Sequence, residues 1–242
     1  MGRVITRLVK EGFPECTISA GVDPMCTDDL GYPVYSSFKD LGPDVGDVIV
    51  DFSVVSVLGE MLDFAVSTET PAVICTTGYN DCQLLDISET SKKVAIFRSG
   101  NMSLGINLII KLAETATKVL GENFDIEVIE AHHNQKIDAP SGTALMIADA
   151  ISNASPLALN YEFDRHSKRM KRPKNEIGIH SIRGGTIVGE HEIVFAGHDE
   201  VIRISHSAAS KEVFAEGAVN AAIYLAGKAP GSYDMNDLLK SK

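Results

Sequence analysis

The first hundred residues alternate between short apolar runs and longer amphipathic stretches, and this alternation constrains the fold more than any other feature. We expect strands at residues 16–22, 47–52, 72–76 and 94–97, and helices at residues 3–10, 54–67 and 81–90. Strands separated by helices of about 10–15 residues predict a parallel sheet with right-handed crossovers. The expected class is an α/β, doubly wound domain that begins with a helix. The apolar run at 47–52 predicts a strand buried on both faces.

The rest of the chain follows a different order of elements. One stripe of a long helix is formed by Leu104, Leu108, Leu112, Ala116 and Val119. Beyond it, Phe124, Ile126 and Val128 alternate with charged residues, which predicts a half-buried strand. A helix near Ser141 is followed by strand-like runs at 176–183, 187–195 and 200–206, and then by a helix carrying Phe214, Ala218, Ala221 and Leu225. Consecutive strands with tight glycine turns predict an antiparallel or mixed sheet, hence a second domain of the α+β class.

Composition excludes several classes of protein. Of 242 residues, 44% are hydrophobic and 23% charged, which excludes disordered and collagen-like chains. The net charge of −11 argues against nucleic acid or an anionic membrane as partner, and no apolar run has the roughly 18 residues of a membrane span. The four cysteines are too few for a disulfide framework and have no metal-type spacing. We therefore expect a soluble protein of a reducing compartment.

Segment 130–144 holds the densest group of chemically useful side chains. It follows a strand and opens a helix whose expected N-cap is Ser141, so the N–H groups of Gly142 and Thr143 would face an anion. The loop just before this helix carries His132, His133 and Lys136. A capped helix with two surface histidines is the plain alternative. Cations next to an anion cradle instead favour a site that binds an anion and transfers protons, although neither a zinc-protease nor a hydrolase motif is present.

Several motifs give the chain a specific resemblance. They are Glu130-Ala131-His132-His133 through Lys136, Asp138-Ala139-Pro140-Ser141-Gly142-Thr143, Asp51-Phe52-Ser53, Thr76-Thr77-Gly78-Tyr79, residues 101–107, Arg183-Gly184-Gly185 with Gly189-Glu190-His191, and residues 214–218. In this order they resemble the dihydrodipicolinate reductase family over nearly the whole chain. The resemblance implies an NAD(P)H-dependent oxidoreductase that reduces 4-hydroxy-tetrahydrodipicolinate to tetrahydrodipicolinate, in the diaminopimelate route to lysine.

The resemblance also implies an organisation. Residues 1–103 and 212–242 would form a Rossmann-like dinucleotide-binding domain. Residues 104–211 would form the substrate domain, whose open mixed sheet builds a homotetramer. The substrate would be a small dicarboxylate and the location cytoplasmic.

Roles can be carried over by position. His132 matches the proton donor or acceptor of the family and Lys136 its proton donor. Substrate binding falls to His133, Ser141, Gly142 and Thr143. Cofactor loops that touch the nicotinamide half correspond to Cys75-Thr76-Thr77 and Ser99-Gly100-Asn101-Met102, although the family usually has Gly where this chain has Cys75. The remaining histidines, His166, His180, His191, His198 and His206, are scattered without metal-ligand spacing, so no metal is expected.

The preferred cofactor can be predicted from the residues after the second expected strand. Asp23 occupies the acidic position that hydrogen-bonds an adenosine ribose, whereas a 2′-phosphate needs a cation. Pro24 follows, and no Lys or Arg lies between Glu11 and Phe38. We therefore expect binding of NADH or NADPH with a preference for NADH.

Two alternatives remain open. Residues 165–174 carry six positive charges, which resembles a nucleic-acid patch, but a solvated loop is the favoured interpretation in so acidic a protein. The other alternative is a catalytically weak or silent ligand-binding form of the same fold. It arises because the chain starts at Met1-Gly2-Arg3, where family members end a glycine loop, so the first strand is expected to be missing. Such a form would bind NADH weakly and be poorly ordered around residues 1–15.

Overall fold

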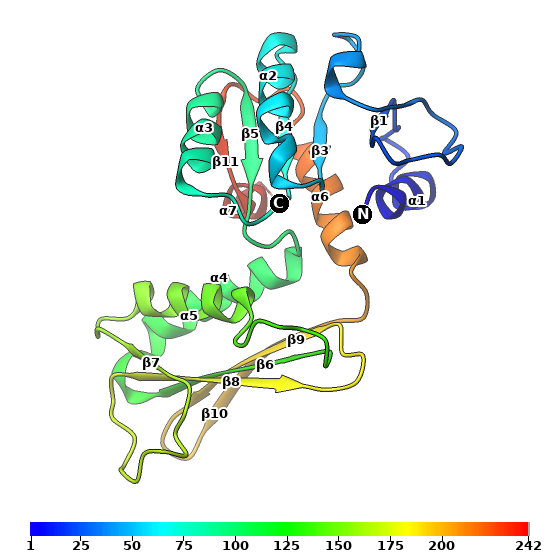
Figure 1. Ribbon diagram of the computed structural model, residues 1–242. Coiled ribbons are helices and arrows are strands. Elements are labelled where there is room, and N and C mark those ends of the chain that lie inside the picture. The colour runs from blue at the N-terminus through cyan, green and yellow to red at the C-terminus, as the bar shows by residue number, and fades with distance from the viewer. Residues whose placement is uncertain (242) are drawn as a thin grey trace. The chain divides into compact units, whose positions relative to one another are not determined.

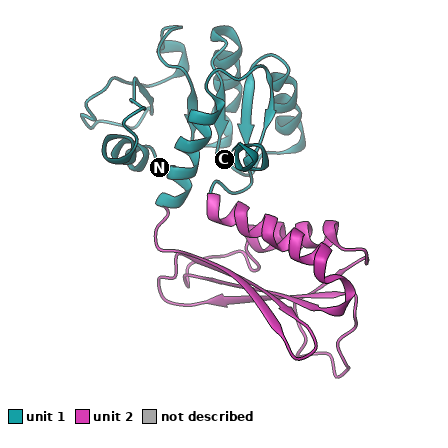
Figure 2. Ribbon diagram, turned by 180° about the vertical axis from the view of Figure 1, so that it is seen from behind, with its two compact units in different colours: residues 1–103, 212–242 teal, residues 104–211 magenta. Residues whose placement is uncertain are grey.

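The computed structural model describes residues 1–241 (Figure 1). The chain divides into two compact units, Met1–Ser103 with Glu212–Lys242, and Leu104–Lys211 (Figure 2). No helix within residues 1–241 is both long enough and apolar enough to cross a membrane.

The first unit is built on a four-stranded parallel sheet in the order β11-β5-β4-β3. Its strands are β3 (Ile49–Asp51), β4 (Ala72–Ile74), β5 (Ala95–Arg98) and β11 (Gly231–Tyr233). Its helices are α1 (Gly2–Gly12), α2 (Leu58–Thr68), α3 (Asp81–Ser91), α6 (Glu212–Leu225) and α7 (Met235–Lys240), with short 3₁₀ turns at Phe38–Asp40 and Val55–Val57.

Helices cover both faces of this sheet. Ile49 packs in one apolar cluster with α2 and α3, while its neighbour Val50 packs in another with α1 and α6. Successive strand residues point to opposite faces, so the two clusters lie on opposite sides of the sheet. The doubly wound α/β architecture is thereby confirmed.

Details of the first unit differ from expectation. The expected strand at 16–22 is reduced to β1 (Gly21–Val22), which pairs in a separate sheet with β2 (Val34–Tyr35). Ile49 and Val50 are only half-buried, because among the described strands β3 pairs with β4 alone. Expected disorder near the N-terminus is also wrong, since α1 buries Ile5 and Val9 against α6. Strand β11 and helix α7 were not anticipated.

The second unit is a five-stranded mixed sheet in the order β10-β9-β6-β8-β7, with two helices on one face. Strands β6 (Asp125–His132), β8 (Glu176–Arg183) and β7 (Asn160–Glu162) are parallel neighbours. Strand β9 (Gly189–Ala196) pairs antiparallel with β6, and β10 (Val201–Ala208) pairs antiparallel with β9. The helices are α4 (Leu104–Leu120), followed by a 3₁₀ turn at Gly121–Asn123, and α5 (Gly142–Ala154). The expected α+β class with a mixed sheet is confirmed.

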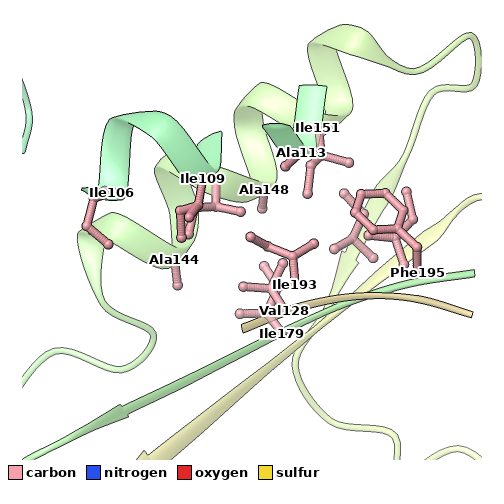
Figure 3. Packing of buried hydrophobic residues seen from close by; sticks show 13 residues of the cluster. Ile106, Ile109, Ala113, Val128, Ala144, Ala148, Ile151, Ile179, Ile193 and Phe195 are labelled. Carbon is pink, nitrogen blue, oxygen red and sulfur yellow. The ribbon is translucent and has the colours of Figure 1, made fainter. Parts of the chain in front are cut away.

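The core of this unit lies between the helices and one sheet face (Figure 3). Alternation along β6 places Ile126 and Val128 in this core, as predicted. The stripe expected on α4 is not the buried one, because Leu108 and Leu112 are 49% and 46% exposed. The face of α4 that packs on the sheet instead carries Ile106, Ile109, Ala113 and Thr117.

The basic segment 165–174 is partly folded against its own unit. Arg172 donates to Asp125 at 2.9 Å and to Glu127 at 3.0 Å, and also to three backbone carbonyls. Arg165 pairs with Glu176 and Lys168 with Glu162. Carboxylates therefore neutralise three of the six cations. We expected a solvated loop, and these ion pairs are a further argument against a nucleic-acid patch.

Candidate active site

The end of strand β6 carries a buried carboxylate beside a histidine. Glu130 and His132 are two residues apart, so both face the helices, on the same side as Ile126 and Val128. The Glu130 side chain is fully buried and that of His132 is 12% exposed. A buried charge of this kind persists only when it is paired and hydrogen-bonded.

Glu130 accepts hydrogen bonds from three parts of the second unit. Arg183, at the end of β8, makes a two-pronged contact with Nη1 at 2.8 Å and Nη2 at 2.7 Å. His132 Nδ1 lies 2.6 Å from Oε2. The backbone N–H of Ser141 donates to Oε1 at 3.1 Å. One carboxylate thus joins the histidine, a neighbouring strand and the start of α5.

The charge of Glu130 settles which nitrogen of His132 carries a proton. Burial alone would raise the pKa of Glu130, but the hydrogen bonds from Arg183 and His132 lower it to about 2. An ionised carboxylate accepts hydrogen bonds only, so the Nδ1 atom of His132 must be the donor. His132 therefore presents Nε2 for proton exchange.

The loop that follows β6 holds Lys136. Its Nζ atom lies 2.8 Å from Asp138 Oδ1, and this hydrogen bond lowers the pKa of Asp138. Backbone bonds tie the loop to the turn after β8, from Gly184 N–H to His132 O at 2.9 Å and from Asn134 N–H to Gly185 O at 3.3 Å. Lys136 and His132 therefore belong to one segment that backbone hydrogen bonds hold in place.

Helix α5 begins at this segment, and Ser141 is its N-cap as predicted. The Ser141 Oγ atom accepts from Ala144 N–H at 3.1 Å and lies 3.1 Å from His191 Nε2. This hydroxyl is buried and already has two polar partners, so the role of Ser141 in the structure is to cap the start of the helix. The first turn, which includes Gly142 and Thr143, is the end of a helix at which anions bind well.

His191 on β9 is a buried member of the site that sequence analysis dismissed. Its ring packs edge-on against that of His132 with centroids 5.3 Å apart, and it lies directly opposite His206 on β10. Burial and the nearby His132 lower its pKa to about 4, so the ring is neutral near pH 7. The Nδ1 atoms of both His191 and His206 are buried without a hydrogen-bond partner in residues 1–241.

The pKa of His191 predicts a pH dependence of stability. Unfolded His191 binds a proton below about pH 6.5, whereas folded His191 does so only near pH 4, so stability is complete above pH 6.5 and lost as the pH falls toward 4. The difference corresponds to about 3 kcal/mol. The free energy of unfolding, measured with urea, should fall less between about pH 7 and about pH 5 in His191→Gln than in the unaltered protein. His198→Gln, at a side chain that is 98% exposed, should leave the loss unchanged.

The first unit contains a separate candidate site at the carboxyl edge of its parallel sheet. The segments after β3, β4 and β5 all leave the sheet at this edge, and they include Ser53, Cys75-Thr76-Thr77 and residues 99–102. A hollow of about 370 Å³ is lined there by Phe52, Ser53, Val54, Val55, Cys75, Thr76 and Thr77. Ligands of open α/β sheets bind outside the carboxyl ends of the strands.

The residues of this edge fit a nicotinamide dinucleotide. The Thr76 hydroxyl is buried at the hollow, close to the Tyr79 side chain, and makes no hydrogen bond of good geometry within residues 1–241. Burial and the Asp51 carboxylate raise the pKa of the Cys75 thiol, which keeps it uncharged at the same hollow. A neutral thiol and a hydroxyl suit an uncharged carboxamide better than an anion.

The loop 99–102 is fixed by its own bonds and by α6. Ser99 Oγ donates to Asn101 O at 2.9 Å, and Ser103 N–H donates to Asn101 Oδ1 at 2.8 Å. A Cβ atom added at Gly217 would lie 1.7 Å from the Met102 carbonyl oxygen. The backbone of α6 therefore passes directly against Met102, and only glycine permits this approach.

Asp23 lies away from the four-stranded sheet, at the end of β1. Its Oδ1 atom accepts from Met25 N–H at 2.9 Å, which orders the loop after β1. Two cations of α1 reach this same loop, since Lys10 donates to Leu30 O at 3.1 Å and Arg3 pairs with Asp28. The loop after Asp23 is therefore contacted by cations that precede it in sequence, which the composition of residues 11–38 does not indicate.

The second unit thus brings together His132, Lys136, Ser141, Gly142 and Thr143, while the expected cofactor residues belong to the first unit. Sequence analysis gave no role to Glu130, Arg183 or His191. The alternation along β6 was a usable signal for Glu130, because it places a carboxylate on a core-facing position that requires a cationic partner. No cluster of three or more His, Cys, Asp or Glu side chains suited to a metal ion occurs within residues 1–241.

Comparison with known proteins identifies the family. A family model for "Dihydrodipicolinate reductase, N-terminus" matches residues 1–102, and one for "Dihydrodipicolinate reductase, C-terminus" matches residues 105–239. The 4-hydroxy-tetrahydrodipicolinate reductase of Caldanaerobacter subterraneus subsp. tengcongensis is 52% identical over 240 residues, which are 99% of this chain and 94% of that protein. The one from Clostridium tetani is 48% identical over 241 residues, covering 100% and 93%.

A solved structure agrees at the level of the fold. The dipicolinate-bound dihydrodipicolinate reductase of Paenisporosarcina sp. TG-14 superposes with a TM-score of 0.78 at 24% identity, covering 97% of this chain and 94% of that one. The two matched halves, the full-length relatives and the shared architecture lead to one conclusion. The chain belongs to the dihydrodipicolinate reductase family.

Proposed function

We propose that this protein reduces 4-hydroxy-tetrahydrodipicolinate to tetrahydrodipicolinate with a reduced nicotinamide cofactor, as its curated relatives are named for doing. The observation that carries the proposal is the pairing of His132 with the ionised Glu130 next to the start of α5. In that arrangement, the ring that we propose to transfer a proton lies beside a helix end of the kind that suits carboxylates. A cyclic dicarboxylate needs both.

The protein groups have distinct tasks in this reaction. Loss of the 4-hydroxyl of the substrate as water would give a conjugated C=C–C=N system, to which a bound reduced nicotinamide would supply a hydride. Hydride addition leaves negative charge away from the carbon that receives the hydride. Lys136 is the proposed donor of the proton that quenches this charge, and His132 exchanges a proton through Nε2. The first turn of α5, with Gly142 and Thr143, fixes one carboxylate of the substrate, and His133 contacts the other end.

An absorbance assay tests the proposal. NADH consumption is followed while the substrate is generated in the cuvette by the preceding enzyme of the route. We expect turnover that depends on both that enzyme and this protein. If NADH binds but is not consumed, the catalytically silent alternative replaces the proposal.

NADH is the proposed preferred cofactor. Asp23 would accept hydrogen bonds from a free ribose 2′-hydroxyl and repel a 2′-phosphate. Calorimetric titration should give a lower Kd for NADH than for NADPH. Asp23→Ala should raise the Kd for NADH and leave the Kd for NADPH unchanged, so the two values should become more alike. Tighter NADPH binding to the unaltered protein would contradict this assignment.

The proposal also includes a homotetramer in the cytoplasm. The sheet of the second unit carries helices on one face only, and the side chains of Ile182 and Val201 on its strands are 51% and 53% exposed. Exposed apolar groups on an uncovered sheet support pairing with another copy. The four cysteines are free thiols, which suits a reducing compartment. Light scattering of the purified protein tests the assembly.

A further inference from the structure

We propose that Glu130 and Arg183 are positioning residues for the reduction, whose ion pair orients His132 and links it to both Lys136 and the start of α5. This inference rests on the proposed function for its catalytic meaning. Its geometry is independent of that function. Arg183 lies 53 positions from Glu130 in sequence, so only the fold brings the two together.

The first step concerns the ring of His132. Glu130 Oε2 holds Nδ1 at 2.6 Å, while Arg183 Nη1 donates to the same oxygen at 2.8 Å. Arg183 therefore fixes where this oxygen lies, and the oxygen fixes the tautomer and the plane of the ring. A carboxylate that orients a histidine through its second nitrogen serves the same purpose in catalytic triads and metal sites.

The second step connects this pair to Lys136. Arg183 Nη2 donates to the backbone carbonyl of Asp138 at 2.6 Å, and the Asp138 side chain holds Lys136 Nζ at 2.8 Å. One guanidinium group thus bonds both the carboxylate that orients His132 and the residue that holds Lys136. The spacing between the two proposed proton-transferring groups depends on Arg183.

The third step connects the pair to the first turn of α5, where Gly142 and Thr143 are proposed to bind a carboxylate. Glu130 Oε1 accepts from the N–H of Ser141, the N-cap of α5. The helix start therefore has its position set by the same carboxylate as His132. Arg183 also donates to this oxygen at 2.7 Å, so both oxygens of Glu130 carry two donors.

Other titratable groups lie close to this pair. The His191 ring packs against that of His132, and His206 and Lys136 act electrostatically on His191. Of the described residues, Glu130 alone makes a direct hydrogen bond to the His132 ring. Its removal should therefore change the protonation behaviour of His132 more than any other single replacement.

The experiment replaces Glu130 with glutamine, which keeps the shape and removes the charge. In protein labelled with ¹⁵N-histidine, we expect the parent to show His132 with a protonated Nδ1, the signal being assigned by its absence in His132→Asn. In Glu130→Gln, that tautomer should no longer dominate. We expect kcat to fall by about 10–100-fold, as when a carboxylate behind a functional histidine is removed. The limb of the pH profile that depends on His132 should change, because the anion next to its ring is gone.

Glu176→Gln is the matched control. Glu176 begins the strand that Arg183 ends, is 5% exposed, and pairs with Arg165. It loses an equally buried charge without touching the site, so it should keep the His132 tautomer, the pH profile and kcat. Loss of activity in both variants would assign the effect to general destabilisation and overturn the inference.

A second variant covers failure of Glu130→Gln to fold, which is a risk because the partly buried Arg183 would lose its carboxylate partner. Glu130→Gln combined with Arg183→Met removes both charges, and we expect the same change of tautomer. An unchanged His132 tautomer and pH limb in either folded variant would overturn the inference. If the tautomer changes as expected but the parent protein consumes no NADH, the proposed function fails while the positioning role stands.

Discussion

Replacement of Lys136 by alanine should lower kcat by about 10²–10⁴-fold, the usual effect of removing a general acid. Lys136 is held at 2.8 Å from Asp138 on the loop that also carries His132 and His133, and its side chain is 23% exposed. Water reaches it too little to replace a fixed ammonium group. Steady-state kinetics with enzymatically generated substrate would measure the loss.

Two comparisons make the result interpretable. Lys118→Ala removes an exposed lysine from the last turn of α4 in the same unit and should leave kcat unchanged. His132→Asn should lower kcat and remove one limb of the pH profile. Near-normal kcat in Lys136→Ala would exclude Lys136 as the proton donor.

Gly217→Ala should be the most destabilising small substitution in the first unit. The new Cβ would lie 1.7 Å from the Met102 carbonyl oxygen and 2.8 Å from its carbon, and a backbone group cannot rotate away. Overpacking commonly costs about 1–3 kcal/mol, and a clash with backbone belongs at or above the upper end. At about 2–4 °C per kcal/mol in a protein of this size, Tm should fall by roughly 6–12 °C.

Gly59→Ala is the control, because a Cβ at Gly59 meets nothing within 4 Å and the site is helical. It should leave Tm unchanged or raise it slightly. Since α6 holds the loop 99–102 in place, Gly217→Ala should also weaken NADH binding. An unaltered Tm would mean that α6 can shift away from Met102 at little cost.

Periodicity predicted most elements because each one is a local property of the chain. Strand β8 was predicted at its observed bounds, and α3 was predicted within one residue of them. The predicted buried face of α4 was wrong. Leu108 and Leu112 are spaced as residues on one side of a helix, and Ile106 and Ile109 are too. Two apolar stripes are equivalent in a sequence, and only the packing partner decides which one is buried.

The site was predictable only in part for a similar reason. The residues of 132–143 are adjacent in sequence, so their proximity needed no fold. Arg183 and His191 reach Glu130 and Ser141 through the pairing of β8 and β9 with β6, and that register is not encoded locally. The pKa of about 4 for His191 likewise arises from burial, which a sequence shows only indirectly.

The discontinuity of the first unit has a consequence for biosynthesis. Strand β11 completes the sheet by pairing with β5, and α6 supplies Ala215 and Val219 to the cluster around α1. A ribosome therefore makes the whole second unit before it releases the last pieces of the first. Residues 104–211 can fold as a contiguous insert, while the N-terminal segment waits with unpaired strand edges and exposed apolar surface. The part of the chain translated first is thus the part that finishes folding last, and its apolar surface stays exposed for longest.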